Sequence, residues 1–230
     1  YLEAVRKISF TPEDVATNPQ KHVDLSTFLR EEFGLPYFLT VMDLSHEPET
    51  VAQANADLGA MPIISEYLPG QINKRGNLFG QGFAFSEENI NRLRLPHFAR
   101  HGRNRVFIEA MRSLKQEYEN AVPTVAYVMG PFTLMFELLG EILMTNFVVS
   151  QGATKVVNPL VGRLLDYATR VSISYVQALA EAGVDVIVIL DPSSELIPHL
   201  GPKRTIPLVF NPAAKLITAI NDLGLAAVYH

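Results

Sequence analysis

The sequence predicts an α/β fold in which helices wrap a parallel sheet. Apolar runs of strand length alternate with longer segments that have helical periodicity, and this alternation is typical of βα units. The runs are apolar almost throughout, as strands buried on both faces of a parallel sheet are. Five runs are predicted as strands: Tyr37–Met42, Thr124–Met129, Val184–Leu190, Ile206–Phe210 and Ala226–Tyr229.

Two helices have clear signals. The first follows Asn158 and Pro159, which suit an N-cap and a first helical position, and it stops at Gly183. Its apolar residues recur at steps of three and four and form one stripe: Leu160, Leu164, Ala168, Val171, Tyr175 and Leu179. The second helix is predicted over residues 104–120. Gly183 leads directly into a strand, and such short turns are typical of a barrel or a doubly wound sheet.

Composition excludes several classes of protein. The 230 residues contain no linker or charge block, so we predict a single domain over residues 1–230. With 19 basic and 24 acidic residues the net charge is −5, and nucleic acid is not an expected partner. Cysteine is absent, which excludes disulfides, Cys-ligated zinc and a thiol nucleophile. We expect a cytoplasmic protein.

No membrane span or secretory signal is predicted. The most apolar stretch, Leu134–Val149, contains Glu137 and Glu141 and is shorter than the roughly 20 residues that cross a bilayer. The sequence begins at Tyr1 rather than at a methionine. We therefore expect it to be part of a longer polypeptide.

Two segments are more specific than the general pattern. Residues 128–134 read Val-Met-Gly-Pro-Phe-Thr-Leu, and residues 181–194 read Glu-Ala-Gly-Val-Asp-Val-Ile-Val-Ile-Leu-Asp-Pro-Ser-Ser. Together they resemble the uroporphyrinogen decarboxylase (URO-D) superfamily, and within it the methylcobalamin:coenzyme M methyltransferase-like branch. Members carry a Gly-Pro-Phe-Thr turn and an Ala-Gly-Ala-Asp-Val strand that ends in Asp-Pro-Ser. The resemblance covers most of residues 31–230.

This resemblance implies a TIM (β/α)₈ barrel with its active site at the carboxyl ends of the strands. Residues 1–33 would form an N-terminal helical extension. Five predicted strands are too few to close such a barrel, and the helix that members have before the strand equivalent to Ile206–Phe210 is nearly absent. We therefore expect the barrel to be incomplete in this sequence.

The resemblance also implies a chemistry. In the methyltransferases zinc holds the acceptor thiol as a thiolate, since a free thiol has a pKa of about 8.5. The methyl group comes from methylcobalamin on a partner corrinoid protein. Zinc is held there by a His-x-Cys-Gly-Asn loop, whereas here Phe210 is followed by Asn211-Pro212-Ala213. Either the protein lacks the metal or the loop is missing from the sequence, so no metal ligand is assigned.

Two strand-end segments supply candidate site residues. Asp191, Ser193 and Ser194 follow a buried strand, where a carboxylate can orient a ligand, although an Asx or Ser turn is an equal alternative. We take Asp191 as a catalytic candidate and both serines as substrate-binding candidates. Gly130 and Pro131 are expected to shape the strand-to-helix turn and are candidates for substrate contact.

Three further candidates follow the last two predicted strands. Tyr229 is a candidate for substrate binding, and His230 is a catalytic candidate because it lies at a strand's carboxyl end. Asn211 could present its amide at the barrel mouth or could be a loop residue.

An acidic run, residues 42–49, follows the first strand with three carboxylates and one histidine. In the family a similar loop lines the pocket, so Glu47 is taken as catalytic and Glu49 as substrate-binding. Metal ligation is an alternative, because such side chains bind hard or borderline ions. A solvated acidic loop, favoured by the helix N-terminus, is another.

The basic run over residues 100–105 could bind an anionic substrate, but it precedes a helix, and a solvated flank is the favoured interpretation. The arginine-rich N-terminal motif of true decarboxylases is absent.

Three hypotheses remain. The favoured one is a corrinoid-dependent methyltransferase, which moves a methyl group between a methylcobalamin-bearing partner and a thiol or related acceptor, with a small molecule as methyl donor or acceptor. The others are a uroporphyrinogen decarboxylase-type lyase and a non-catalytic corrinoid- or ligand-binding relative.

Overall fold

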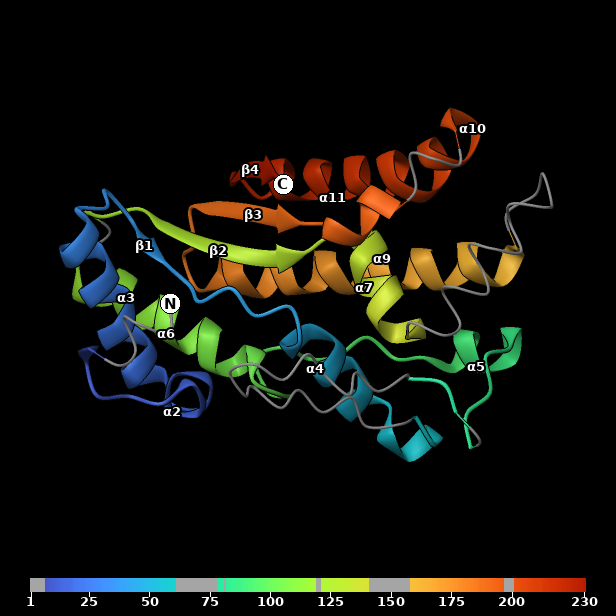
Figure 1. The fold of residues 1–230 in the computed structure, drawn as a ribbon, viewed down its shortest axis with the longest axis horizontal. Coiled ribbons are helices and arrows are strands. Elements are labelled where there is room, and N and C mark those ends of the chain that lie inside the picture. The colour runs from blue at the N-terminus through green and yellow to red at the C-terminus, as the bar shows by residue number, and fades with distance from the viewer. Residues whose placement is uncertain (1–6, 61–77, 81, 119–120, 141–157, 197–200) are drawn as a thin grey trace.

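Four parallel strands lie side by side in the order β1–β2–β3–β4 in the computed structural model (Figure 1), which describes residues 7–60, 78–80, 82–118, 121–140, 158–196 and 201–230. The strands are Phe38–Leu39 (β1), Thr124–Met129 (β2), Val186–Leu190 (β3) and Ala226–Tyr229 (β4). Met129 pairs with Leu190 and Ile189 with Tyr229, so the carboxyl ends of β2, β3 and β4 are level. Strands in sequence order are what consecutive βα units of a barrel give.

Helices connect and cover these strands. The described α-helices are Pro12–Thr17 (α2), Pro19–Phe33 (α3), His46–Ala54 (α4), Glu87–Arg92 (α5), Asn104–Glu117 (α6), Pro131–Leu139 (α7), Pro159–Glu181 (α9), Pro202–Thr205 (α10) and Asn211–Asp222 (α11). Short 3₁₀ helices cover Ala56–Leu58 (η1) and Pro192–Leu196 (η2). No described helix is long and apolar enough to cross a membrane.

Helix α9 confirms the strongest helix prediction. Asn158 Oδ1 accepts a hydrogen bond from the Leu160 amide at 2.9 Å, Pro159 is the first helical residue, and Gly183 adopts a φ of 88° after the end. Ser172 Oγ donates to Met129 O at 3.1 Å, at the carboxyl end of β2. The first half of α9 therefore extends beyond the strand ends (Figure 1).

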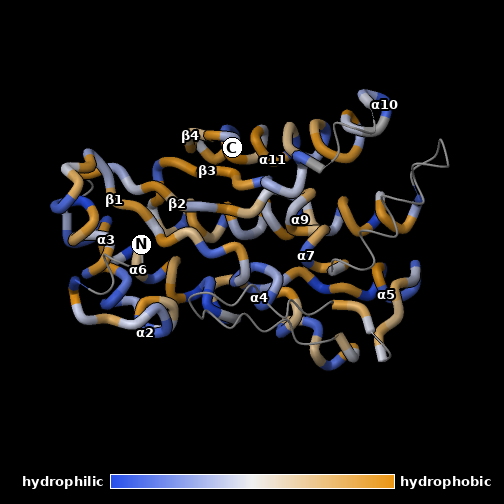
Figure 2. Tube along the Cα trace, in the orientation of Figure 1, coloured by the Kyte–Doolittle hydropathy of each residue, from blue (hydrophilic) through white to orange (hydrophobic). Residues whose placement is uncertain are grey.

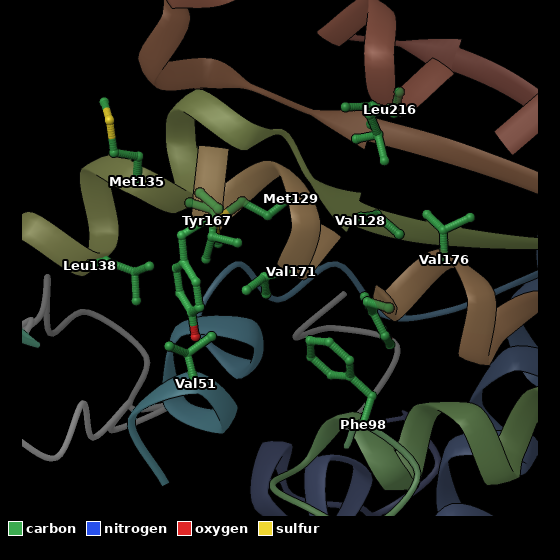
Figure 3. Close-up of a cluster of buried hydrophobic side chains, with 14 of the residues drawn as sticks. Val51, Phe98, Val128, Met129, Met135, Leu138, Tyr167, Val171, Val176 and Leu216 are labelled. Atoms are coloured by element: carbon green, nitrogen blue, oxygen red, sulfur yellow. The ribbon is translucent and has the colours of Figure 1, made fainter. Parts of the chain in front are cut away.

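One main hydrophobic core fills the space between the sheet and its helices. Figure 3 shows Val128 and Met129 of β2 in a cluster of buried side chains with Tyr167 and Val171 of α9, and with side chains of α4 and α7. Figure 2 shows the hydropathy along the chain: β3 is hydrophobic, whereas outer helices such as α2 contain both hydrophobic and hydrophilic residues. Burial of this apolar surface is the main driving force for folding.

The N-terminal helices pack beside β1. Ser26 Oγ of α3 accepts from the Leu39 amide at 3.1 Å and donates to Leu39 O at 2.9 Å. His22 Nε2 of α3 accepts from the Val41 amide at 3.3 Å. The side of β1 that does not pair with β2 is thus hydrogen bonded to a helix. Strand β1 spans two residues instead of the six predicted, and next to it the Tyr127 amide of β2 donates to the Thr40 side chain, at 3.2 Å, instead of to a backbone carbonyl.

The predicted strand Ile206–Phe210 is wrong. These residues form a π-helix (η4) that joins α10 to α11. Pro207 lacks the amide hydrogen that an interior strand needs. The buried positions Val209, Ala213, Leu216 and Ile220 are spaced as on a helix face. The apolar run over residues 206–210 is long enough for a strand, but the buried residues from Val209 to Ile220 have helical periodicity.

Asp185 holds the amino ends of two strands together. Both of its carboxylate oxygens contact Lys115 Nζ of α6, at 3.0 and 2.8 Å, and Oδ2 accepts from the Thr124 amide at 2.7 Å. Burial alone would raise the pKa of Asp185, but the contacts with Lys115 and Thr124 lower it overall. This is the physical reason for the acidic residue in the Gly-Val-Asp-Val motif.

We expect Asp185→Ala to lower the free energy of unfolding by about 1–3 kcal/mol, because it leaves the Thr124 amide and the Lys115 ammonium without their acceptor. Urea unfolding followed by far-UV circular dichroism measures this change. Asp222→Ala, at an exposed position of α11, is the control and should change the value by less than about 0.5 kcal/mol. Equal effects of the two substitutions would contradict the assigned role of Asp185.

Candidate functional site

The candidate site is formed where β2, β3 and β4 end. Gly130 directly follows β2, and its amide donates to Leu190 O at 2.7 Å. Asp191 directly follows β3, and its amide donates to His230 O at 3.0 Å. The predicted residues at these three strand ends are thus brought together, as parallel strand ends in a barrel are expected to be.

Asp191 caps a helix from another segment of the chain. Its Oδ1 accepts from the Thr133 amide, in the first turn of α7, at 2.7 Å. Gly130 is the N-cap residue of α7 and has no side chain with which to do so. A Cβ on Gly130 would lie 2.3 Å from Asp191 Cγ, so glycine is required for this approach. The carboxylate takes the position that an N-cap side chain normally fills.

Tyr229 is the second partner of Asp191. Its hydroxyl donates to Asp191 Oδ2 at 3.0 Å, and its side chain is 40% exposed. Burial raises the pKa of the Asp191 carboxyl, and the hydrogen bonds from Thr133 and Tyr229 offset this only in part. Burial, together with the charge of Asp191, raises the pKa of Tyr229 to about 12. The tyrosine therefore stays protonated near neutral pH and can donate.

The other strand-end candidates lie around this pair. The Ser193 amide donates to Thr133 Oγ1 at 3.0 Å, and the Ser194 amide donates to Asp191 O at 2.9 Å, which closes a turn. Pro131 is buried as the first residue of α7. His230 is exposed, and its amide donates to Ile189 O at 2.9 Å. The segment thus forms a turn, and the Asp191 carboxylate contacts Thr133 and Tyr229.

Asn211 does not share this environment. It is exposed and is the first residue of α11, in the continuous helical segment that replaces the predicted strand. The prediction that Asn211 lies at the end of a strand is therefore wrong.

Glu47 reaches the site from α4. Its side chain is 1% exposed, and Oε1 accepts from the Met129 amide at 2.8 Å, one residue before Gly130. Burial and, to a smaller extent, the nearby charge of Asp43 together raise the pKa of Glu47 to about 8, although the hydrogen bond from the Met129 amide opposes them. A carboxyl group that titrates close to neutral pH beside a strand end is a candidate acid or base.

The acidic run that contains Glu47 is not a solvated loop. Asp43, His46 and Glu47 are all buried, and Glu49 is partly buried. Arg103 Nη1 donates to Asp43 Oδ2 at 2.6 Å, and its Nε donates to Glu49 Oε2 at 2.7 Å. The expectation of a solvated basic flank is thus wrong for Arg103. Glu49 is engaged by an arginine and is not free to bind a substrate in this arrangement.

Neutral polar groups complete the surroundings of Glu47. Asn104 Nδ2 lies 2.9 Å from His46 Nδ1, and Thr50 Oγ1 lies 2.6 Å from Asn104 Oδ1. Burial lowers the pKa of His46 to about 4, so the ring is neutral near pH 7. Sequence reasoning missed Asn104, and also Tyr175 of α9, which is assigned to the core stripe. The spacing of apolar residues along α6 could not predict that Asn104 contacts His46, which is 58 residues away in the sequence.

Metal ligation is not supported by the described residues. No group of three or more His, Asp or Glu side chains within that part of the chain is placed to hold a metal ion. The chain has no cysteine, and Asp43 and Glu49 are paired with Arg103. These residues do not fit the zinc site that the resemblance implies, so no chemical step is assigned to zinc.

A separate hollow of about 450 Å³ lies between α5 and the first half of α9. Arg163 and Arg170 line it, but Arg163 pairs with Glu87 at 2.7 Å and Arg170 with Asp166 at 3.3 Å. None of the predicted site residues lines this hollow.

The arrangement is that of a parallel α/β barrel whose polar residues gather at the carboxyl ends of its strands. The sequence model of the uroporphyrinogen decarboxylase (URO-D) family matches residues 74–230. The chain belongs to this family, and its fold is the TIM barrel of the family, represented by four consecutive strands in the described residues.

Curated relatives point to the methyltransferase branch. A methylcobamide:CoM methyltransferase MtbA of Methanosarcina acetivorans is 27% identical over 207 residues, which cover 77% of this chain and 58% of that protein. The Methanosarcina mazei MtbA is 28% identical over 132 residues, covering 56% and 36%. A uroporphyrinogen decarboxylase of Syntrophotalea carbinolica is 25% identical over 122 residues, covering 53% and 35%. The chain thus spans little more than half of the longest match.

A solved structure shows the same fold. A methyltransferase from Methanosarcina mazei superposes with a TM-score of 0.72 at 21% identity, covering 100% of this chain and 61% of that one.

We expect Gly130→Ala to lower the free energy of unfolding by about 1–3 kcal/mol, because its Cβ overlaps the Asp191 side chain. Urea unfolding measures the change. Gly162→Ala, where a Cβ meets nothing within 4 Å, is the control and should stabilise α9 by about 0.5–1 kcal/mol. The double variant G130A/D191G should be less destabilised than the sum of its single changes. Additive effects would show that the two residues do not meet.

We expect the Glu47→Gln variant to become more stable, relative to the native protein, as pH rises. Folding raises the pKa of Glu47 from 4.5 to about 8, so the folded state resists ionisation, and the native protein loses stability between these values as pH increases. Glutamine cannot ionise, and the stability difference between variant and native protein should grow by up to about 1.4 kcal/mol per pH unit in that window. Urea unfolding at pH 6.5 and 8 tests this. A pH-independent difference would rule out a buried titrating Glu47.

Proposed function

We propose that this protein is a corrinoid-dependent methyltransferase that moves a methyl group between a methylcobamide-bearing partner protein and a thiol. The observation that carries the proposal is the gathering of Glu47, Gly130, Asp191 and Tyr229 at the strand ends of a URO-D family chain. The curated relatives named methylcobamide:CoM methyltransferases support the methyl donor and the thiol acceptor.

The reaction requires a thiolate. Its sulfur attacks the methyl carbon, a new S–C bond forms, and the Co–C bond breaks with both electrons left on the cobalt of the methyl donor. The thiol proton must go to a base. A thiol has an ordinary pKa of about 8.5, and burial raises the pKa of Glu47 to about 8. Because the two values are close, Glu47 is the proposed acceptor of that proton.

The other strand-end residues would position the substrates. Asp191 has both oxygens occupied by Thr133 and Tyr229, so its proposed role is to hold the Gly130 turn and the tyrosine. Tyr229 is partly exposed and can offer its ring and hydroxyl to a ligand. Ser193, Ser194 and the exposed His230 lie at the same strand ends and are proposed to line the site.

A decarboxylase is the second candidate, and the likeness to the Syntrophotalea carbinolica enzyme favours it. That reaction acts on a substrate with many carboxylates, which arginines would be expected to clamp. Arg103, which contacts the acidic run that contains Glu47, is already engaged by Asp43 and Glu49. The methyltransferase is therefore preferred.

We expect the purified protein to transfer a methyl group from methylcobalamin to 2-mercaptoethanesulfonate. Anaerobic assays that follow the cobalamin absorbance, with mass spectrometry of the methylated thiol, measure this activity. Glu47→Gln should lower kcat by about 10²-fold or more if Glu47 is the base, and Glu88→Gln, at an exposed position of α5, is the matched control. In the native protein kcat/KM should increase as pH rises toward 8, because the base must be ionised.

The assay also separates the alternatives. Loss of carbon dioxide from uroporphyrinogen without thiol methylation would establish the decarboxylase instead. Binding of methylcobalamin with neither reaction would indicate a non-catalytic relative, and either result would reject the methyltransferase proposal.

A further inference from the structure

Three consecutive residues at the start of α6 contact the segment that carries Glu47. Gly102 has a φ of +63°, and a Cβ there would lie 2.0 Å from Thr50 Oγ1 of α4. The side chain of Asn104 meets His46 and Thr50. Between them, Arg103 points its guanidinium into the acidic run. This close fit involves backbone conformation as well as side chains, so it is a built contact and not a chance surface ion pair.

Arg103 makes a separate contact with each nitrogen of its guanidinium. Nη1 donates to Asp43 Oδ2 at 2.6 Å, Nε to Glu49 Oε2 at 2.7 Å, and Nη2 to Ser45 Oγ at 2.9 Å. The arginine side chain is 14% exposed and that of Asp43 is 5% exposed. Solvent screening is weak at such sites, and an arginine fork of this kind fixes the orientation of its partners.

Asp43 connects this clamp to Glu47. The charged and titratable groups that face Glu47 in the described structure are Asp43 of the same segment, His46 beside it, and Tyr175 of α9. Strand β2 contributes the amide of Met129. His46 is neutral near pH 7 because its pKa is about 4, and Tyr175 is also neutral because burial raises its pKa. Asp43 is therefore the ionised group whose charge acts on Glu47.

We propose that Arg103 is a positioning residue for Glu47: by cancelling the charge of Asp43 and tying the acidic run to α6, it keeps the Glu47 carboxyl at the Met129 amide and able to exchange a proton there. Arg103 would thus tune the pKa of Glu47. This rests on the proposed function only where Glu47 is taken as the acceptor of the thiol proton. Loss of a solely structural arginine would loosen this segment and move the pKa of Glu47 down toward its ordinary value, not up.

Infrared difference spectroscopy of the carboxyl C=O stretch across pH tests the proposal without any substrate. The band that disappears in Glu47→Gln identifies Glu47. In Arg103→Gln the charge of Asp43 is no longer cancelled, and the Glu47 midpoint should move up by about one pH unit or more. In Arg103→Lys the charge is kept but the fork is lost, and the midpoint should stay closer to that of the native protein. Arg105→Gln, at an exposed residue of the same run that pairs with Glu109, is the control and should leave it unchanged.

Asp43→Asn provides an independent arm if Arg103→Gln fails to fold. Removing the charge of Asp43 should move the Glu47 midpoint down, and in the double variant D43N/R103Q the midpoint should no longer be raised above that of the native protein. A midpoint that is unchanged or lowered in Arg103→Gln, or unchanged in Asp43→Asn if Arg103→Gln does not fold, would overturn the proposal. If the midpoint moves but the pH profile of methyl transfer does not, Arg103 tunes Glu47 as proposed and the assignment of Glu47 as the base is rejected.

Discussion

A carboxylate at the end of β3 caps the helix that follows β2, and the arrangement of the strand ends depends on that contact. Asp191 can reach the first turn of α7 because Gly130 has no side chain to keep it away. The same carboxylate holds the hydroxyl of Tyr229 at the end of β4. One side chain therefore fixes three consecutive strand ends relative to one another. Asp191 thus accepts one of these hydrogen bonds at each oxygen and shapes the strand ends, while Tyr229 remains 40% exposed.

The end of β1 is organised differently, by charge instead of by helix capping. Asp43 and Glu49 share Arg103, and their segment delivers the buried Glu47 to the amide of Met129. Burying these groups is costly unless each has a partner. Among the described residues Glu47 has a backbone amide as its partner and no cation, so burial raises its pKa. The burial of a carboxyl group that titrates near neutral pH therefore costs stability at this position, and such shifted pKa values are common at functional sites.

Local signals in the sequence allowed much of the fold to be predicted. The ends of β2, β4 and α9 follow from apolar runs, from Asn158 and from the glycine at 183, all of which act over a few residues. The nearness of Gly130, Asp191 and Glu47 follows from the rule that parallel strand ends converge. Arg103 could not be predicted, because its partners Asp43 and Glu49 are 60 and 54 residues away. The run at residues 206–210 misled because a short apolar segment suits a strand or a buried helix equally well.

Helix α9 gives the mouth of the sheet an uneven rim. Ser172 is level with the end of β2, so the thirteen residues from Pro159 onward stand about 20 Å above the strands on one side. For the corrinoid protein that we propose as a partner, this projecting half of α9 would be part of the surface met on the way to Tyr229.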